Sequence, residues 1–146
     1  MNIDIKAALS DDVNTILKIE NACFSNPWSE GSIRESFENP DSRFYLAFCE
    51  GEPAGYLGVQ VFSGEGNMLN VATLPEFRRQ GVAKALINKA LENEMEFLTL
   101  EVRESNEAAI ALYTSLGFVK VGARPDYYSN PTETAILMTK TIKEIK

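Results

Sequence analysis

Arg78-Arg79-Gln80-Gly81-Val82-Ala83 is the stretch that decides the fold, because it joins a strand-like run, Asn67 to Leu74, to a helix-like run, Gly81 to Asn93. The first N–H groups of a helix have no partner inside the helix, and the helix dipole adds a partial positive charge there. A glycine lets a ligand approach the backbone, and arginine forks suit phosphate oxygens. The stretch therefore predicts a pyrophosphate site at the start of the helix, formed by Arg78, Arg79 and Gln80 with Gly81, Val82, Ala83 and Lys84.

Two other phosphate-binding motifs do not fit this turn. The Walker motif ends in Gly-Lys-Ser/Thr, whereas Gly81 is followed by Val82 and Ala83. The dinucleotide motif needs further glycines and an acidic residue about twenty positions on, and Gly81 stands alone here. On the motif alone, a plain surface turn capped by Gly81 is an equally good interpretation.

The composition indicates one globular domain over residues 1–146. A chain of 146 residues with 45% hydrophobic content can bury one real core. No apolar run approaches the roughly 18 residues that span a bilayer, and the amino terminus lacks the layout of a signal peptide. Cys23 and Cys49 have neither metal-binding spacing nor a disulfide framework. We therefore expect a cytoplasmic protein that binds neither metal nor membrane.

Charge and residue content narrow the chemistry. The net charge of −7 disfavours nucleic acid as a partner and favours a cationic substrate, such as an amine or a basic protein. The chain contains no histidine, which excludes Ser/Cys–His nucleophile pairs, His-ligated zinc and an imidazole general base. Any proton acceptor must be a carboxylate, a tyrosine, a cysteine or bound water.

Periodicity, caps and turns predict a series of strands and helices. A helix crosses over between the strands Asn67 to Leu74 and Phe97 to Val102, so these two strands run parallel. The arginine-rich turn and Glu101 then share the carboxyl edge, where ligands bind in α/β sheets. The other predicted elements are strands Asn2 to Ala8, Phe44 to Cys49, Ala54 to Phe62, Phe118 to Gly122 and Glu133 to Thr141, helices capped by Ser10, Ser29 and Asn106, and a long aromatic loop from Arg124 to Pro131.

This order of elements, with the pattern Arg/Gln-x-x-Gly-x-Gly/Ala at residues 78–83, resembles the GNAT acetyltransferases over nearly the whole chain. The resemblance implies an α/β (α+β) fold with a mixed, largely antiparallel seven-stranded sheet, a parallel central pair and about four flanking helices. Within the family, the chain is most similar to the RimI subfamily, bacterial enzymes that acetylate the N-terminal alanine of a small-subunit ribosomal protein. The motifs that carry this similarity are Leu100-Glu101-Val102-Arg103-x-Ser105-Asn106, Leu112-Tyr113-x-x-Leu116-Gly117-Phe118, Phe24-x-x-Pro27-Trp28-Ser29 and Tyr127-Tyr128.

Two residues would carry the chemistry that the resemblance implies. Glu101 would act as the general base, directly or through water, and the Tyr113 hydroxyl would protonate the leaving thiolate. From the residues alone, Glu101 also fits a solvated strand end or an ion pair with Arg103, and a mid-helix tyrosine is usually a core residue. Glu101 is favoured as the base because no histidine competes for that role.

The resemblance also implies acetyl-CoA as the acetyl donor and an amine as the acceptor. Trp28 fits a simple core anchor as well as a pocket wall, and Asn106 fits a helix cap as well as a contact to the cofactor arm. The acetyl donor would contact the arginine-rich turn and also Val71, Ala72, Thr73 and Asn106. The acceptor would contact Pro27, Trp28, Tyr127 and Tyr128.

Three functions agree with the sequence. An N-terminal protein acetyltransferase agrees best, and the alternatives are an acetyltransferase of a small amine or lysine side chain and a CoA-binding module without catalysis. The presence of Glu101 and Tyr113 argues against the module. The expected partners are acetyl-CoA and an amine acceptor, with a monomer or a homodimer both open and no nucleic acid.

Overall fold

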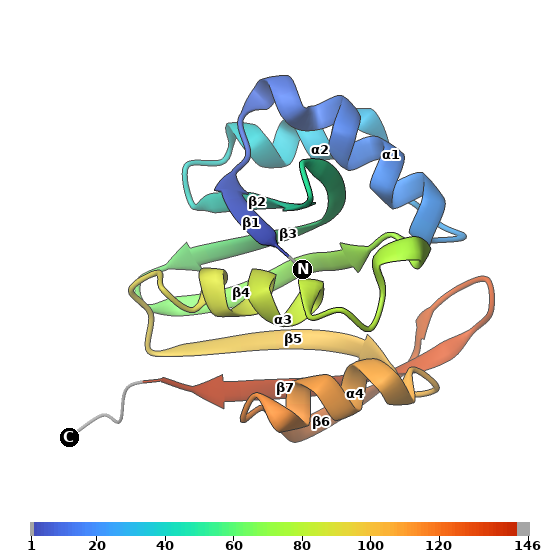
Figure 1. Ribbon diagram of the computed structural model, residues 1–146. Helices are drawn as coiled ribbons and strands as arrows, with labels where there is room; N and C mark the ends of the chain where they lie inside the picture. The colour runs from blue at the N-terminus through green and yellow to red at the C-terminus, as the bar shows by residue number, and fades with distance from the viewer. Residues whose placement is uncertain (1, 143–146) are drawn as a thin grey trace.

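The hydrophobic runs of the sequence pair into one mixed sheet. In the computed structural model, which describes residues 2–142, the strand order is β1-β2-β3-β4-β5-β7-β6 (Figure 1). Every neighbouring pair is antiparallel except β4 and β5, which confirms the predicted seven-stranded mixed sheet with a parallel central pair. The strands are β1 (Ile3–Ala7), β2 (Ser42–Cys49), β3 (Glu52–Phe62), β4 (Glu65–Thr73), β5 (Phe97–Arg103), β6 (Val119–Tyr128) and β7 (Glu133–Thr141).

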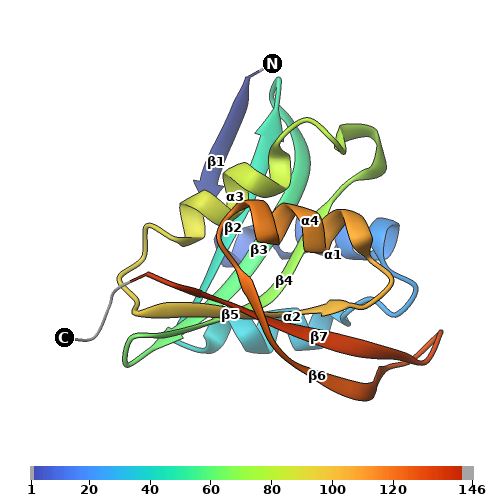
Figure 2. The same ribbon diagram turned by 90° about the horizontal axis from the view of Figure 1, so that it is seen from below.

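Helices cover both faces of this sheet, and each pair of helices closes one core. The pair α1 (Val13–Cys23) and α2 (Glu30–Glu38) lies on one face, and α3 (Val82–Ala90) and α4 (Glu107–Ser115) lie on the other (Figure 2). One-turn 3₁₀ helices, η1 (Ser10–Asp12) and η2 (Pro75–Phe77), precede α1 and α3. The apolar stripes of the helices meet the sheet in two clusters of buried side chains, one beneath each helix pair. Central strands are buried on both faces, which explains their continuous hydrophobic runs.

Local caps set several helix ends as the sequence predicts. The Ser29 hydroxyl accepts a hydrogen bond from Ser32 N at 3.1 Å, and Asn106 Oδ1 accepts one from Ala109 N at 3.1 Å. Gly117 follows α4 with a φ of +96°, the left-handed conformation of a helix end. The prediction for Ser10 is wrong in detail, because residues 10–12 form η1 and the α-helix begins at Val13.

The last hairpin is longer than the sequence suggests. The predicted loop from Arg124 to Pro131 is mostly strand, because β6 continues to Tyr128. The β6–β7 register nevertheless breaks between Arg124 and Tyr128, so residues 125–127 lie opposite no partner on β7. Pro125 can lie within β6 because this is an edge strand, where a proline without an N–H is tolerated.

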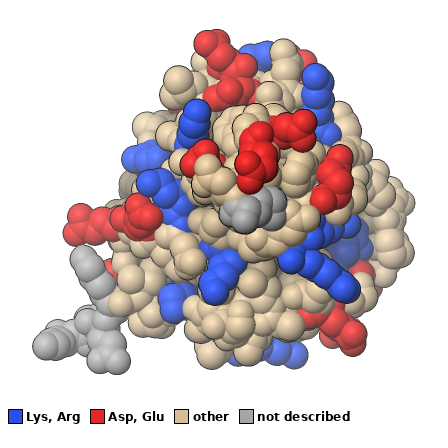
Figure 3. All heavy atoms as spheres, in the orientation of Figure 1, with Lys and Arg blue, Asp and Glu red and all other residues tan. Residues whose placement is uncertain are grey.

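Three further observations bear on function. No helix among residues 2–142 is long and apolar enough to cross a membrane. The same residues contain no cluster of three or more side chains that could hold a metal ion. On the face that carries α3 and α4, basic and acidic side chains are mixed rather than separated into one charged patch (Figure 3).

Candidate active site

The parallel strands β4 and β5 pair only near their amino-terminal ends. The last pair joins Asn67 and Thr99, after which β4 runs on to Thr73 and β5 pairs only with β7. The β3–β4 register shifts at this point, where Leu69 is an extra residue on β4, and such bulges bend a strand and increase its twist. The two strands therefore part toward their carboxyl ends, at the edge where the sequence predicts the site.

Beyond the bulge, β4 presents main-chain groups to its unpaired side. Leu74 N donates to Ala54 O at 2.8 Å, so by the alternation of a strand Thr73 and Val71 face away from β3 and Ala72 faces toward it. Val71, Ala72 and Thr73 are predicted to contact the acetyl donor. Only Val71 and Thr73 turn their main-chain groups toward the unpaired side of β4.

Internal partners occupy both of these main-chain positions. Thr73 O accepts from Arg78 Nε at 3.0 Å and from Cys23 Sγ at 3.3 Å, while Val71 N donates to Asn70 Oδ1 at 3.0 Å. A ligand that pairs with this edge must exchange those contacts for its own.

The start of α3 has the properties of an anion site. Gly81 is the N-cap residue, with a φ of +87°, and no side chain caps the helix. Among the described residues, the N–H groups of Val82, Ala83 and Lys84 have no hydrogen-bond partner, because the first helical bond runs from Ala85 N to Gly81 O at 3.0 Å. Exposed cationic side chains stand on both sides, at Arg79 and Lys84. This is the donor set that a pyrophosphate needs.

Glu101 lies at the carboxyl end of β5 among aromatic residues. Its side chain is 28% exposed, and Oε1 lies 3.8 Å from Nη1 of the exposed Arg124. Interaction with the Glu101 carboxylate, followed by burial, raises the pKa of Tyr127. Burial and then Glu101 raise the pKa of Tyr128 to about 12, and the two tyrosine rings meet edge to face, with centroids 5.1 Å apart. The structure thus brings together one proposed catalytic residue and two of the three aromatic residues predicted for the acceptor pocket, Tyr127 and Tyr128.

Tyr113 lies on α4 with its ring in the core, 5.9 Å from Phe118 between centroids. Burial, with a smaller effect of Tyr128, raises the pKa of Tyr113 to about 12, so its hydroxyl stays protonated at neutral pH. The hydroxyl makes no hydrogen bond within residues 2–142, and no buried side-chain oxygen there lacks a partner. It follows that the Tyr113 oxygen is not completely buried, although the residue as a whole is only 6% exposed.

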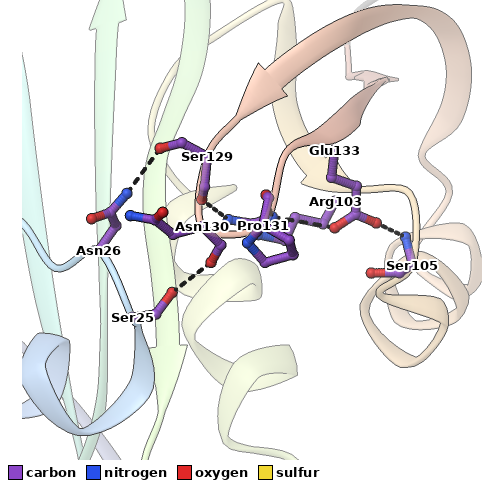
Figure 4. Close-up of polar contacts among 8 residues, drawn as sticks. All are labelled: Ser25, Asn26, Arg103, Ser105, Ser129, Asn130, Pro131 and Glu133. Carbon is purple, nitrogen blue, oxygen red and sulfur yellow. Dashed lines mark hydrogen bonds and ion pairs between the residues drawn. The ribbon is translucent and has the colours of Figure 1, made fainter.

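The connection between α1 and α2 meets the β6–β7 hairpin beside this site. Ser25 Oγ donates to Asn130 O at 3.1 Å, and Asn26 Nδ2 donates to Ser129 Oγ at 3.0 Å (Figure 4). Arg103 then joins the hairpin to β5 through the Ser129 carbonyl at 2.9 Å. A chain of hydrogen bonds therefore joins segments that are far apart in the sequence beside Glu101 and Tyr128.

Trp28 belongs to the core beneath α1 and α2, whereas the neighbouring Pro27 is exposed. The main-chain N–H of Trp28 donates to Glu20 Oε2 at 2.9 Å. The other oxygen of this buried carboxylate accepts from Tyr56 Oη and Asn70 Nδ2. Burial, with the adjacent Glu20 carboxylate, raises the pKa of Tyr56. Glu20 thereby ties the loop of Pro27 and Trp28 to the bulged part of β4.

Sequence reasoning missed the contacts of Glu20 and Arg103. Glu20 occupies a core-facing position on the stripe that begins with Val13 and Ile16, and a carboxylate there is the signal of a buried polar network. The alternative ion pair between Glu101 and Arg103 is wrong: Arg103 pairs with Glu133 at 3.2 Å. No local pattern indicates that partner.

Comparisons with known proteins show the family to which this chain belongs. The sequence pattern of the Acetyltransferase (GNAT) family matches residues 13–118. The putative ribosomal protein bS18-alanine N-acetyltransferase of Bacillus subtilis (strain 168) is 33% identical over an alignment of 139 residues that covers 92% of each chain. The corresponding enzyme of Escherichia coli (strain K12) is 35% identical over 148 positions, which cover 94% of this chain and 97% of that protein.

Solved structures give the same result. The crystal structure of the ribosomal-protein-S18-alanine N-acetyltransferase from Escherichia coli superposes with a TM-score of 0.92 at 30% identity, covering 99% of this chain and 97% of that one. The family match spans most of the sequence, and the relatives align over nearly their full length. This chain belongs to the GNAT family of acetyl-CoA-dependent N-acetyltransferases.

Proposed function

We propose that this protein acetylates the N-terminal α-amine of a protein, and that a ribosomal protein beginning with alanine is its acceptor. The names of its relatives support this choice: the Escherichia coli protein is named a bS18-alanine N-acetyltransferase and the Bacillus subtilis protein a putative one, and both align almost end to end. The observation that carries the chemistry is the position of Glu101, a partly buried carboxylate beside the unpaired edge of β4 and against Tyr127. We expect a cytoplasmic location and a monomeric or homodimeric state to accompany this function.

Glu101 is the proton acceptor in this proposal. The amine nitrogen attacks the carbonyl carbon of the acetyl thioester, a C–N bond forms, the C–S bond breaks, and the amine proton passes to the Glu101 carboxylate directly or through water. Described residues offer no histidine for this task, in keeping with the sequence. Arg124 places a positive charge 3.8 Å from the Glu101 carboxylate.

Tyr113 supplies a proton to the departing thiolate. Its pKa of about 12 keeps the hydroxyl protonated, and the oxygen has no hydrogen-bond partner in the described residues. A tyrosine whose ring is held in the core suits this role, because the core keeps the ring in one orientation.

Acetyl-CoA supplies the acetyl group, and the residues present fit it. The unpartnered N–H groups of Val82, Ala83 and Lys84, together with Arg79, suit the pyrophosphate. Val71 and Thr73 suit the amides of the pantetheine arm, which would join β4 as an added strand. Arg78 holds the turn in place through Thr73 O, and Gln80 Nε2 contacts Glu76 O at 3.4 Å.

The acid–base properties of the two kinds of amine favour an α-amine over a lysine side chain as the acceptor. An α-amino group has a pKa of about 7.7–8.0 and lysine one of about 10.4, so the neutral fraction at pH 7 is roughly a few hundredfold larger for the α-amine. The hydrogen bonds from Ser25 and Asn26 fix the hairpin against the connection between α1 and α2, next to the tyrosines proposed to contact the acceptor.

Release of the CoA thiol tests the proposal directly. We expect turnover with a peptide that begins with alanine, and much less with spermidine or an N-terminally blocked lysine peptide. Glu101→Gln and Tyr113→Phe should each lower kcat on the order of 10²–10⁴-fold with acetyl-CoA binding unchanged. Glu104→Gln and Tyr45→Phe are matched controls away from the reacting atoms. Preference for spermidine or the lysine peptide would favour the small-amine or lysine alternative, and full turnover in both site variants would remove the residue roles.

A further inference from the structure

Arg103 occupies the last position of β5, two residues after Glu101 and on the same side of the strand. Its guanidinium reaches across to the β6–β7 hairpin: Nη1 donates to Pro131 O and Nη2 to Ser129 O, both at 2.9 Å (Figure 4). The same group lies 4.5 Å from the centre of the Tyr128 ring and 3.2 Å from Glu133 Oε1. One side chain therefore spans the distance between the strand of the proposed base and the aromatic hairpin.

The hairpin depends on these contacts for its position. Residues 125–127 have no register partner on β7, and Tyr128 opposite Glu133 is the last pair before the turn. Tyr127 and the turn thus receive little support from the sheet itself. The turn is held by the fork of Arg103 on one side and the hydrogen bonds from Ser25 and Asn26 on the other, while Tyr127 contacts Glu101 and the Tyr128 ring.

The cofactor side has a separate anchor. Glu133 Oε2 accepts a hydrogen bond from Ser105 N at 2.5 Å, whereas its Oε1 faces Arg103. Ser105 leads into Asn106 and α4, so the start of that helix keeps its tie to β7 when Arg103 is removed. One oxygen of Glu133 thus contacts Arg103, which supports the hairpin, and the other contacts Ser105, which leads into α4.

We propose that Arg103 is a positioning residue that sets Tyr127 and Tyr128 against Glu101, and so determines how tightly the acceptor amine is held. This inference rests on the proposed acetyl transfer. A planar guanidinium can bind two carbonyls in a fixed geometry, whereas a lysine ammonium cannot span both. Because small misplacements at a reacting centre lower rates steeply, release of the hairpin weakens acceptor binding and its alignment.

The test compares steady-state constants for each substrate separately. We expect Arg103→Ala to raise the acceptor KM on the order of 10–100-fold while the KM for acetyl-CoA changes less than about twofold. Arg103→Lys keeps the charge beside Glu133 and should give an intermediate acceptor KM. The matched control is Arg43, whose Nη1 also binds two main-chain carbonyls, Pro40 O at 2.7 Å and Ser42 O at 3.0 Å, at the start of β2. Its alanine and lysine variants should leave both KM values unchanged.

The acceptor in these assays is whichever of the alanine, spermidine and lysine substrates the wild type turns over best. Failure of the alanine peptide in the wild type then counts against the proposed function and leaves the role of Arg103 testable. Thermal melts of all variants separate unfolding from misplacement, and Arg103→Lys serves if the alanine variant melts below the assay temperature. An unchanged acceptor KM in a folded Arg103 variant, or an equal rise in both KM values, would overturn the proposal.

Discussion

Replacement of Gly55 by alanine probes the close approach of β3, β4 and α3 behind the proposed donor site. Gly55 lies opposite Thr73, and a Cβ added to it would stand 2.4 Å from Ala72 O and 3.3 Å from both Thr73 Cα and Val82 Cγ1. Since Cβ contacts under 3.0 Å are essentially never observed, at least 0.6 Å (3.0 minus 2.4) must be taken up by movement of the backbone. The displaced segment is the carboxyl-terminal end of β4, which lies next to the start of α3 and is proposed to bind acetyl-CoA.

The expected loss of stability is large for the addition of one methyl group. Overpacking costs about 1–3 kcal/mol, and the upper end applies at Gly55 because the obstacle is a main-chain carbonyl that cannot rotate away. Gly31 is a matched control in α2, where an added Cβ meets only Ser29 Oγ at 3.9 Å. Gly31→Ala should stabilise the protein by roughly 0.4–1 kcal/mol, because alanine restricts the unfolded chain. The same substitution therefore has opposite signs at the two positions.

Urea unfolding measured by circular dichroism gives both free energies of unfolding, and steady-state kinetics give the KM for acetyl-CoA. Gly55→Ala should also raise that KM several-fold, because the shift moves the main chain of Thr73 relative to Val82. A Gly55→Ala protein as stable as the Gly31→Ala protein, with an unchanged KM, would refute the close approach and the location of the donor edge.

Two further predictions concern buried polar groups. Burial raises the pKa of Tyr113 from 10.0 to about 12, so the stability that its neutral hydroxyl contributes is complete below pH 10 and disappears as the pH rises through about 12. Across this window the free energy of unfolding of the wild type should fall by about 3 kcal/mol more than that of Tyr113→Phe, as measured by urea unfolding at several pH values. Equal pH profiles of the two proteins would contradict the assignment. Glu20→Ala leaves Trp28 N, Tyr56 Oη and Asn70 Nδ2 without their acceptor and should cost on the order of 3–5 kcal/mol; a loss below about 1 kcal/mol, similar to that of the exposed control Glu38→Ala, would show that the network contributes little.

Much of the site could be predicted because its parts are local. The turn before α3 is defined by Gly81 and the helix after it, and a helix start exposes N–H groups whatever surrounds it. The crossover helix requires β4 and β5 to be parallel, which brings Glu101 to the edge of that turn. Caps such as Ser29 and Asn106 need only residues within one helical turn. These features follow from spacing and chirality, which the sequence contains directly.

Tertiary structure alone decided the features that depend on contacts between distant segments. The hydrogen bond from Ser25 to Asn130 joins residues 105 positions apart. Arg103 pairs with Glu133 and not with the nearby Glu101, because β7 runs antiparallel to β5 and brings Glu133 within reach of Arg103. The orientation of Val71 and Thr73 toward the unpaired edge depends on the bulge at Leu69, which only pairing with β3 reveals. The sequence by itself therefore determined which groups this protein can use, whereas their final partners were selected by packing and register, since no local pattern records which segments will meet.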